Sequence, residues 1–90
     1  MNYQNNQTFI ANLSFENQIP ILENINKSHG IVYHIYSIED GTKNKITGLL
    51  DVATTLEEAK SKLISHECID RQFANNRHLR IKNITTGLWF

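Results

Sequence analysis

The stretch that decides the fold class is residues 31–53, "IVYHIYSIEDGTKNKITGLLDVA". Its opening "IVYHIYSI" is rich in β-branched and aromatic side chains, which makes it the clearest strand of the chain. A polar loop with a turn signal at Asp40-Gly41 follows, and "ITGLLDVA" then resumes extended structure. Tyr33 and Tyr36 lie three residues apart, so we expect a strand to direct one into the core and the other to the opposite face.

The segment after these two strands predicts the best helix of the chain. In "TLEEAKSKLI", residues 55–64, Thr55 and Glu58 stand at capping-box spacing, and Glu58 is placed to pair with Lys62. Three apolar residues recur at helical spacing and predict its inner stripe: Leu56, Ala59 and Leu63. The polar stretch that follows, residues 65–76, is expected to form a loop.

The segment before the strands, "ENQIPILENINKSHG" at residues 16–30, predicts another helix over its later part. Pro20 suits only the first turn of a helix, and Gly30 suits the exit from one. Between them, a short apolar stripe is expected to face the core: Ile21, Leu22 and Ile25.

Strands are also expected toward both ends of the chain. "TFIANL", residues 8–13, reads as a first strand, and "HLRIKNI", residues 78–84, reads as a last one with Arg80 and Lys82 facing outward. The final "TTGLWF" is expected to turn and add an arm or a short strand. The order predicts an α+β fold of ferredoxin-like type. This is a βαββαβ sandwich with two helices on one face of an antiparallel sheet and the other face open.

An unrelated ββαβ protein is an alternative interpretation of the same chain. "VYHIYSIEDGTKNKITGLLD" reads as one simple hairpin and "LRIKNITTGLWF" as another. In that case the first thirty residues would only cover an edge, and the sheet would still be antiparallel.

Composition narrows the class of protein. Ninety residues with 40% hydrophobic side chains suffice for one domain with a small core. The formal net charge is zero, which disfavours strong non-specific nucleic-acid binding, because such binding depends on cations that displace phosphate counterions. The single Cys68 cannot form an internal disulfide, and the polar opening "MNYQNNQ" resembles neither a signal peptide nor a membrane span. We therefore expect a soluble cytoplasmic protein with no membrane partner.

A set of residues follows the spacing of a known domain family. "FIANL", residues 9–13, has the order aromatic, aliphatic, any residue, Asn, Leu. Further positions match without gaps: Phe15, Leu22, Ile25, Gly30, Val32, Ile35, Asp40 and Gly48. In these features the chain resembles the RNA recognition motif (RRM) family over residues 8–82. The resemblance implies a flexible arm at 1–7, an RRM-like domain at 8–84 and a C-terminal arm or short strand at 85–90.

The third strand departs from the pattern of that family. RRM domains normally present a basic residue, a glycine and two exposed aromatics there, whereas this chain has Thr47, then Leu49 and Asp51 at the aromatic positions. Stacking a base on an aromatic ring is worth about 1–3 kcal/mol, so losing two rings weakens binding. The resemblance therefore implies a small single-stranded RNA-binding module with weak or non-standard binding. Its nucleic-acid-binding residues would be Phe9, Asn12, Lys43, Lys45, Leu49, Arg80 and Lys82.

A protein is the alternative ligand. Exposed Leu49 beside Phe9 would form an apolar contact patch, which suits a non-catalytic interaction, adaptor or inhibitor module such as a phage or mobile-element regulator. No catalytic constellation or phosphate-binding glycine loop appears, so we expect neither an enzyme nor a cofactor. His66 and Cys68 lie two residues apart without a second close pair, so we expect no metal site.

Overall fold

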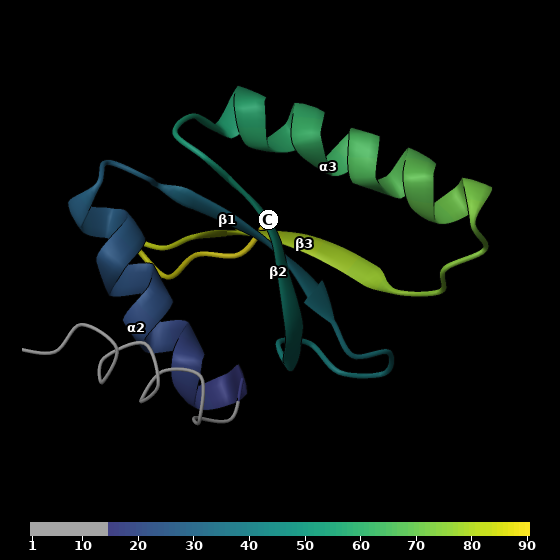
Figure 1. Ribbon diagram of the computed structural model, residues 1–90, viewed down its shortest axis with the longest axis horizontal. Helices are drawn as coiled ribbons and strands as arrows, with labels where there is room; N and C mark the ends of the chain where they lie inside the picture. Colours follow the sequence, from purple (N-terminus) through teal and green to yellow (C-terminus); the bar gives the residue numbers. More distant parts are fainter. Residues whose placement is uncertain (1–14) are drawn as a thin grey trace, which may run out of the picture.

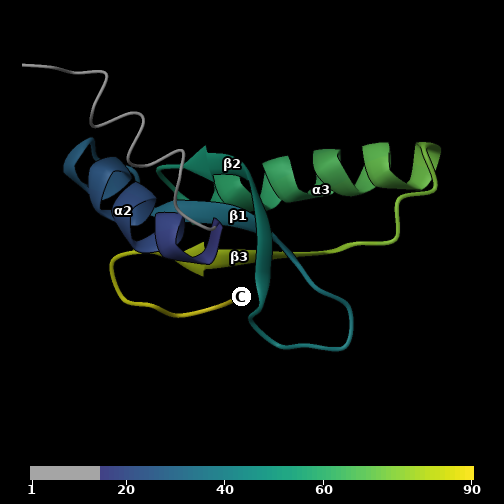
Figure 2. The ribbon, with the colours of Figure 1, turned by 60° about the horizontal axis from the view of Figure 1, so that its bottom comes forward.

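The computed structural model describes residues 15–90 and shows an α+β chain with one antiparallel sheet (Figure 1). Its elements follow in the order α2 (Phe15–Ser28), β1 (Tyr33–Ile38), β2 (Ile46–Ala53), α3 (Leu56–Gln72) and β3 (His78–Asn83). Figure 2 shows the three strands side by side in the order β2, β1, β3. The predicted first strand at 8–13 lies outside the described residues. The α+β class is therefore confirmed, whereas the βαββαβ order stays a prediction.

β1 is the central strand and pairs in antiparallel fashion with both neighbours. Tyr33 lies opposite Ala53 of β2 and opposite Asn83 of β3. The pairing with β3 is regular, whereas the pairing with β2 shifts register between Ile35 and Tyr36 and again toward the loop. The hairpin predicted at residues 31–53 is confirmed, because β1 and β2 pair in antiparallel fashion.

The two helices lie on opposite faces of the sheet (Figure 1). α3 covers the face of Ile35 and Ile81, whose side chains pack with Ala59. α2 covers the other face, where Ile19 packs with Tyr36. Neighbouring residues of a strand point to opposite faces, so Ile35 and Tyr36 belong to two separate clusters. The expected layout, with both helices on one face and the other face open, is wrong.

The physical reason for this layout lies in β1. Its residues 34 to 38 are all buried. A strand that is buried on both faces needs a layer of structure on each side, as the central strands of covered sheets do. One helix on each face of β1 meets that need.

α3 begins where the sequence predicts and ends later. The predicted N-cap is confirmed, because the Glu58 N–H donates to Oγ1 of Thr55 at 3.1 Å. The Glu58 carboxylate accepts from the N–H of Thr54, one residue before the N-cap, at 2.7 Å, so the reciprocal bond of a capping box to Thr55 itself is replaced by this one. The helix continues well beyond its predicted end at Ile64, so the loop expected there is wrong over most of its length. The turns after Ile64 are anchored by a polar contact rather than by a buried apolar stripe. Asp70 accepts two-pronged hydrogen bonds from the guanidinium of Arg77, the shortest at 2.9 Å.

α2 begins earlier than predicted and buries a different residue. The helix starts at Phe15, so Pro20 lies inside it rather than in its first turn. A proline has no N–H for the carbonyl four residues earlier, so the helix forgoes one backbone hydrogen bond there. Ile19 is buried against the sheet, whereas Ile25, expected in the inner stripe, is 44% exposed. Gly30 has a φ of 81°, which confirms its role at the exit of the helix.

The C-terminal residues return along the outer edge of β3 (Figure 2). Gly87, with a φ of 81°, lies in the turn. Trp89 then forms a bridge with Lys82, and the Phe90 N–H donates to the carbonyl of Ile81 at 2.8 Å. The predicted second hairpin is confirmed, and it places the Trp89 side chain beside the sheet.

Candidate binding surface

The sheet face under α2 carries three of the residues that the sequence predicts to bind a ligand. Arg80 and Lys82 lie on it, as expected from their alternation with Ile81. Leu49 is half-buried in the α2-side core, so it forms no exposed patch. Phe9 and Asn12 lie outside the described residues. Because α2 and the C-terminal segment cover this face, the expected open platform for a ligand is wrong.

Trp89 packs against the basic residues of β3 on this face. Its ring centroid lies 5.0 Å from the guanidinium carbon of Arg80 and 5.7 Å from the ammonium nitrogen of Lys82. The ring of Tyr36 is also 5.7 Å away, between centroids. Cation–π contacts contribute about 0.5–1 kcal/mol at exposed sites and more when desolvated. The two cations expected to face phosphate therefore contact the protein's own tryptophan.

A chain of hydrogen bonds, here called the relay, joins this face to α2. Tyr36 Oη donates to Oε2 of Glu23 at 2.7 Å and lies 2.7 Å from Nδ1 of His34. Nε2 of His34 lies 2.9 Å from Nδ2 of Asn26, and Lys82 donates to Glu23 at 2.9 Å. Because Tyr36 donates its proton to Glu23, its oxygen accepts from His34. The ring proton of His34 is therefore assigned to Nδ1, which leaves Nε2 to accept from Asn26.

The relay is almost fully buried. His34 and Tyr36 have no exposed surface, and the side chains of Glu23 and Lys82 are only 13% and 20% exposed. Burial lowers the pKa of His34, an effect that Glu23 opposes and Lys82 reinforces. Burial and the hydrogen bond to Glu23 raise the pKa of Tyr36. The imidazole of His34 and the phenol of Tyr36 are therefore held in their neutral forms, away from solvent. Their hydrogen bonds to Asn26 and Glu23 tie α2 to the sheet.

The loop between β1 and β2 holds the other predicted cations. Arg80 Nη1 donates to the carbonyl of Lys43 at 2.9 Å and to Oδ1 of Asn44 at 3.0 Å. Lys45 pairs with Glu39 at 3.5 Å. Arg80 thus contacts the loop that carries Lys43 and Lys45, through the backbone of Lys43 and the side chain of Asn44. Arg80 and Lys45 already have partners within the chain.

A pocket of about 320 Å³ opens between this loop and the start of α2. Its lining consists of Glu16, Ile19, Pro20, Asn44, Lys45 and Ile46. This volume lies at the lower end of the range for small-molecule sites, about 300–1,000 Å³. Of the predicted binding residues in the described part of the chain, only Lys45 reaches it.

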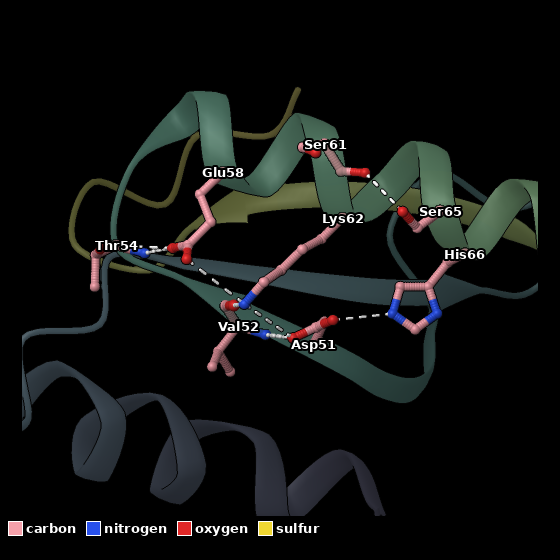
Figure 3. Close-up of polar contacts among 8 residues, drawn as sticks. All are labelled: Asp51, Val52, Thr54, Glu58, Ser61, Lys62, Ser65 and His66. Carbon is pink, nitrogen blue, oxygen red and sulfur yellow. Dashed lines mark hydrogen bonds and ion pairs between the residues drawn. The ribbon is translucent and has the colours of Figure 1, made fainter.

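Side chains of α3 close the outer edge of β2 (Figure 3). Lys62 Nζ donates to the carbonyl of Val52 at 2.7 Å, and the Val52 N–H donates to Oδ1 of Asp51 at 2.9 Å. His66 Nε2 lies 3.0 Å from the other carboxylate oxygen of Asp51. Burial opposes ionisation of Asp51, but the hydrogen bonds from His66, Val52 and Lys62 hold its pKa below the usual value. Lys62 and Asp51 thus bind the carbonyl and the N–H of Val52, backbone groups that an edge strand otherwise leaves unpaired.

The position of Asp51 differs from the sequence expectation. Simple alternation would place Leu49 and Asp51 on one face of the sheet. The register shift between Ile35 and Tyr36 leaves Leu50 as an extra residue in β2. Leu49 consequently faces α2 while Asp51 faces α3, and no aromatic platform forms at these two positions.

Large apolar side chains remain exposed along residues 15–90. They are Ile25, Ile64, Ile69, Phe73, Leu88 and Phe90. Ile69 lies in the last turn of α3, and Phe73, four residues later, is the C-cap residue whose N–H donates to the carbonyl of Ile69 at 3.1 Å, so the two residues lie on the same side of this helix end. Both residues fall in the stretch 65–76 that the sequence predicts as a loop, so neither is among the predicted site residues. The spacing of four was the available signal.

Residues 15–90 were also compared with the requirements of a metal site and of a membrane span. No group of three or more His, Cys, Asp or Glu side chains there could hold a metal ion, and no helix there is long and apolar enough to cross a membrane. Cys68 is exposed, with Nη2 of Arg71 3.2 Å from its sulfur. Comparison of the chain with protein-family models, curated proteins and solved structures finds no match.

Proposed function

We propose that this chain is a non-catalytic protein-binding module. The observation that carries the proposal is the apolar pair at the end of α3, where Ile69 is 46% exposed and Phe73 is 72% exposed. Apolar anchors at i and i+4 are how an amphipathic helix lies in the groove of a partner. Aromatic anchors of this kind commonly carry a large share of the binding energy of an interface.

The arrangement of charge favours a protein over a nucleic acid. The formal net charge of the chain is zero. Basic residues with an acidic partner within the chain include Lys45, Lys62, Arg77 and Lys82. Nucleic-acid affinity draws on cations free to neutralise phosphate, whereas a protein interface depends on apolar anchors that leave water. The exposed surface offers more of the second than of the first.

The test is a pull-down with the tagged full chain, with and without nuclease treatment. The double variant Ile69→Ser, Phe73→Ser should lose a discrete protein that the wild type retains, and nuclease should leave recovery unchanged. Ile25→Ser is the matched control, because it changes an exposed apolar residue of α2 instead. A partner that the double variant still retains, or that nuclease releases, contradicts the proposal.

Single-stranded RNA is a second candidate ligand. It is supported by the resemblance to the RRM family and by one contact, in which Arg80 lies against Trp89 next to Lys43. A flat aromatic ring flanked by cations is the arrangement on which single-stranded nucleic acids stack. Lys43→Glu should then weaken a salt-dependent mobility shift of labelled RNA, while Lys27→Glu on α2 should not. If the wild type shifts no RNA of the pool, or if Lys43→Glu and Lys27→Glu bind RNA equally well, this candidate is removed.

A further inference from the structure

One flank of α3 carries a regular series of exposed residues. They recur at alternate spacings of three and four, which keeps them on one side of the helix: Glu57, Lys60, Ile64, Glu67 and Arg71. All of them are exposed, and Ile64 in the middle of α3 is 60% exposed. We call this set the charged stripe. It places one apolar residue between charges of both signs.

The charges of the stripe have no ion pair among residues 15–90, unlike those on the other flank of α3. There, Glu58 and Lys62 lie 3.8 Å apart, and Lys62 also pairs with Asp51 at 3.4 Å (Figure 3). On the stripe, the only side-chain hydrogen bond within that part of the chain runs from Arg71 to the sulfur of Cys68. The stripe therefore keeps its charges available for a second molecule.

The order of the charges is complementary to itself when a second helix runs antiparallel. Glu57 lies seven residues before Ile64 and Arg71 lies seven residues after it, so pairing about Ile64 sets Glu57 against the Arg71 of a second copy. Lys60 lies four residues before the centre and Glu67 three after it. These two therefore meet within one residue, or about 1.5 Å along the axis. Each contact joins opposite charges, and Ile64 meets Ile64.

We propose that the charged stripe is the interface of a two-fold symmetric homodimer, in which α3 packs antiparallel against the α3 of a second copy of this chain. A two-fold interface uses the same patch on both copies, which is what a self-complementary order of charges allows. A parallel arrangement would set each charge against its own sign and is disfavoured. Exposed ion pairs select the orientation more than they add affinity, so the dimer is in equilibrium with the monomer.

The dimer goes beyond the proposed protein-binding function and does not rest on it. Phe73 follows Ile64 by nine residues, which places it about 180° around the helix from the stripe. Two paired copies would therefore leave Ile69 and Phe73 free on each. Loss of dimerisation and loss of the partner are separate results, because different residues control them.

The test is sedimentation equilibrium of the full chain over a range of concentrations. The wild type should dimerise, and Lys60→Glu or Glu67→Lys alone should raise the dissociation constant at least about tenfold. The double variant should return to the affinity of the wild type. A mixture of the two single variants should form a heterodimer, because each carries the charge that the other now needs.

The design separates pairing between chains from effects within one helix. Residues 60 and 67 are seven positions apart, whereas side chains of one helix contact each other at spacings of three and four. Recovery in the double variant therefore reports a contact between copies, and circular dichroism checks that each variant is folded. Lys27→Glu makes the same charge change on α2 and should dimerise like the wild type. A wild type that stays monomeric up to about 1 mM, or single variants that dimerise equally well, overturns the proposal.

Discussion

Replacing Tyr36 with phenylalanine removes one oxygen atom from the relay between β1 and α2. That oxygen accepts a hydrogen bond from His34 and donates one to Glu23, both at 2.7 Å. The bond to the carboxylate is charge-assisted and contributes about 1.5–3 kcal/mol, and the bond from His34 about 0.5–1.5 kcal/mol. Tyr36 and His34 have no exposed surface, so water does not replace the lost partner. We expect Tyr36→Phe to lower the free energy of unfolding by about 2–4 kcal/mol.

Urea denaturation followed by circular dichroism measures this difference. For a domain of this size, the lower bound corresponds to a fall in Tm of about 8 °C or more. Tyr33→Phe is the matched control. The Tyr33 ring contacts Phe90 at 6.2 Å between centroids, and its hydroxyl has no hydrogen bond among the described residues. We expect this control to lose less than about 0.5 kcal/mol. If the two variants are equally stable, the relay does not tie α2 to the sheet.

Three further predictions concern pH and the polar contacts of α3. The pKa of His34 lies below its ordinary value of 6.5 in the folded chain, so below that pH the unfolded state binds more protons. The free energy of unfolding should reach its full value above pH 6.5 and decrease as the pH falls toward the lowered pKa, and the decrease should be smaller in His34→Gln. If the urea midpoint changes with pH equally in the wild type and in His34→Gln, this prediction is contradicted. Lys62→Met should lower the free energy of unfolding by about 1 kcal/mol, because the Val52 carbonyl at the β2 edge loses its half-exposed ammonium donor. An unchanged urea midpoint would show that this contact adds nothing. Asp70→Asn should weaken the contact with Arg77 and speed amide hydrogen exchange over the last turns of α3, and unchanged exchange would argue against that anchor.

The elements with strong local signals are the ones that the sequence predicts well. The hairpin at 31–53 combines a β-branched run with a Gly41 turn, and both strands form close to the predicted bounds. Thr55 and Glu58 mark the start of α3 by a hydrogen bond between residues only three positions apart, so the local sequence is enough to predict it. The outward direction of Arg80 and Lys82 relative to Ile81 follows from strand alternation alone.

The covering of the sheet depends on residues that are far apart in the chain. Glu23 of α2 and Trp89 shield the outward-facing Lys82 from solvent. Glu23 is far from Lys82 in the sequence, and Trp89 reaches it only because the chain turns back after β3. His34 reads as a polar residue of a half-exposed strand, but its partner Asn26 allows it to be buried. Long-range pairing of this kind leaves no periodic signal, so the sequence predicts an open sheet face where the structure has a covered one.

The extended end of α3 was missed for a related reason. Its last turns have no buried apolar stripe, and the buried residue there is Asp70, which Arg77 holds from the segment that leads into β3. Helical periodicity is the main signal for a helix, so a helix anchored by polar contacts reads as a loop. The extension of α3 to Gln72 places the exposed residues Ile69 and Phe73 on one side of its end.

The most direct test of the two-sided sheet is a nuclear Overhauser spectrum of the labelled full chain. We predict cross-peaks from the methyl groups of Ile19 in α2 to the ring of Tyr36, and from the methyl group of Ala59 in α3 to Ile35. Each helix would then contact its own face of β1. Cross-peaks from Ile19 and Ala59 to the same face, together with a Tyr36 ring open to a soluble paramagnetic probe, would contradict the closed sheet and restore an open ligand platform.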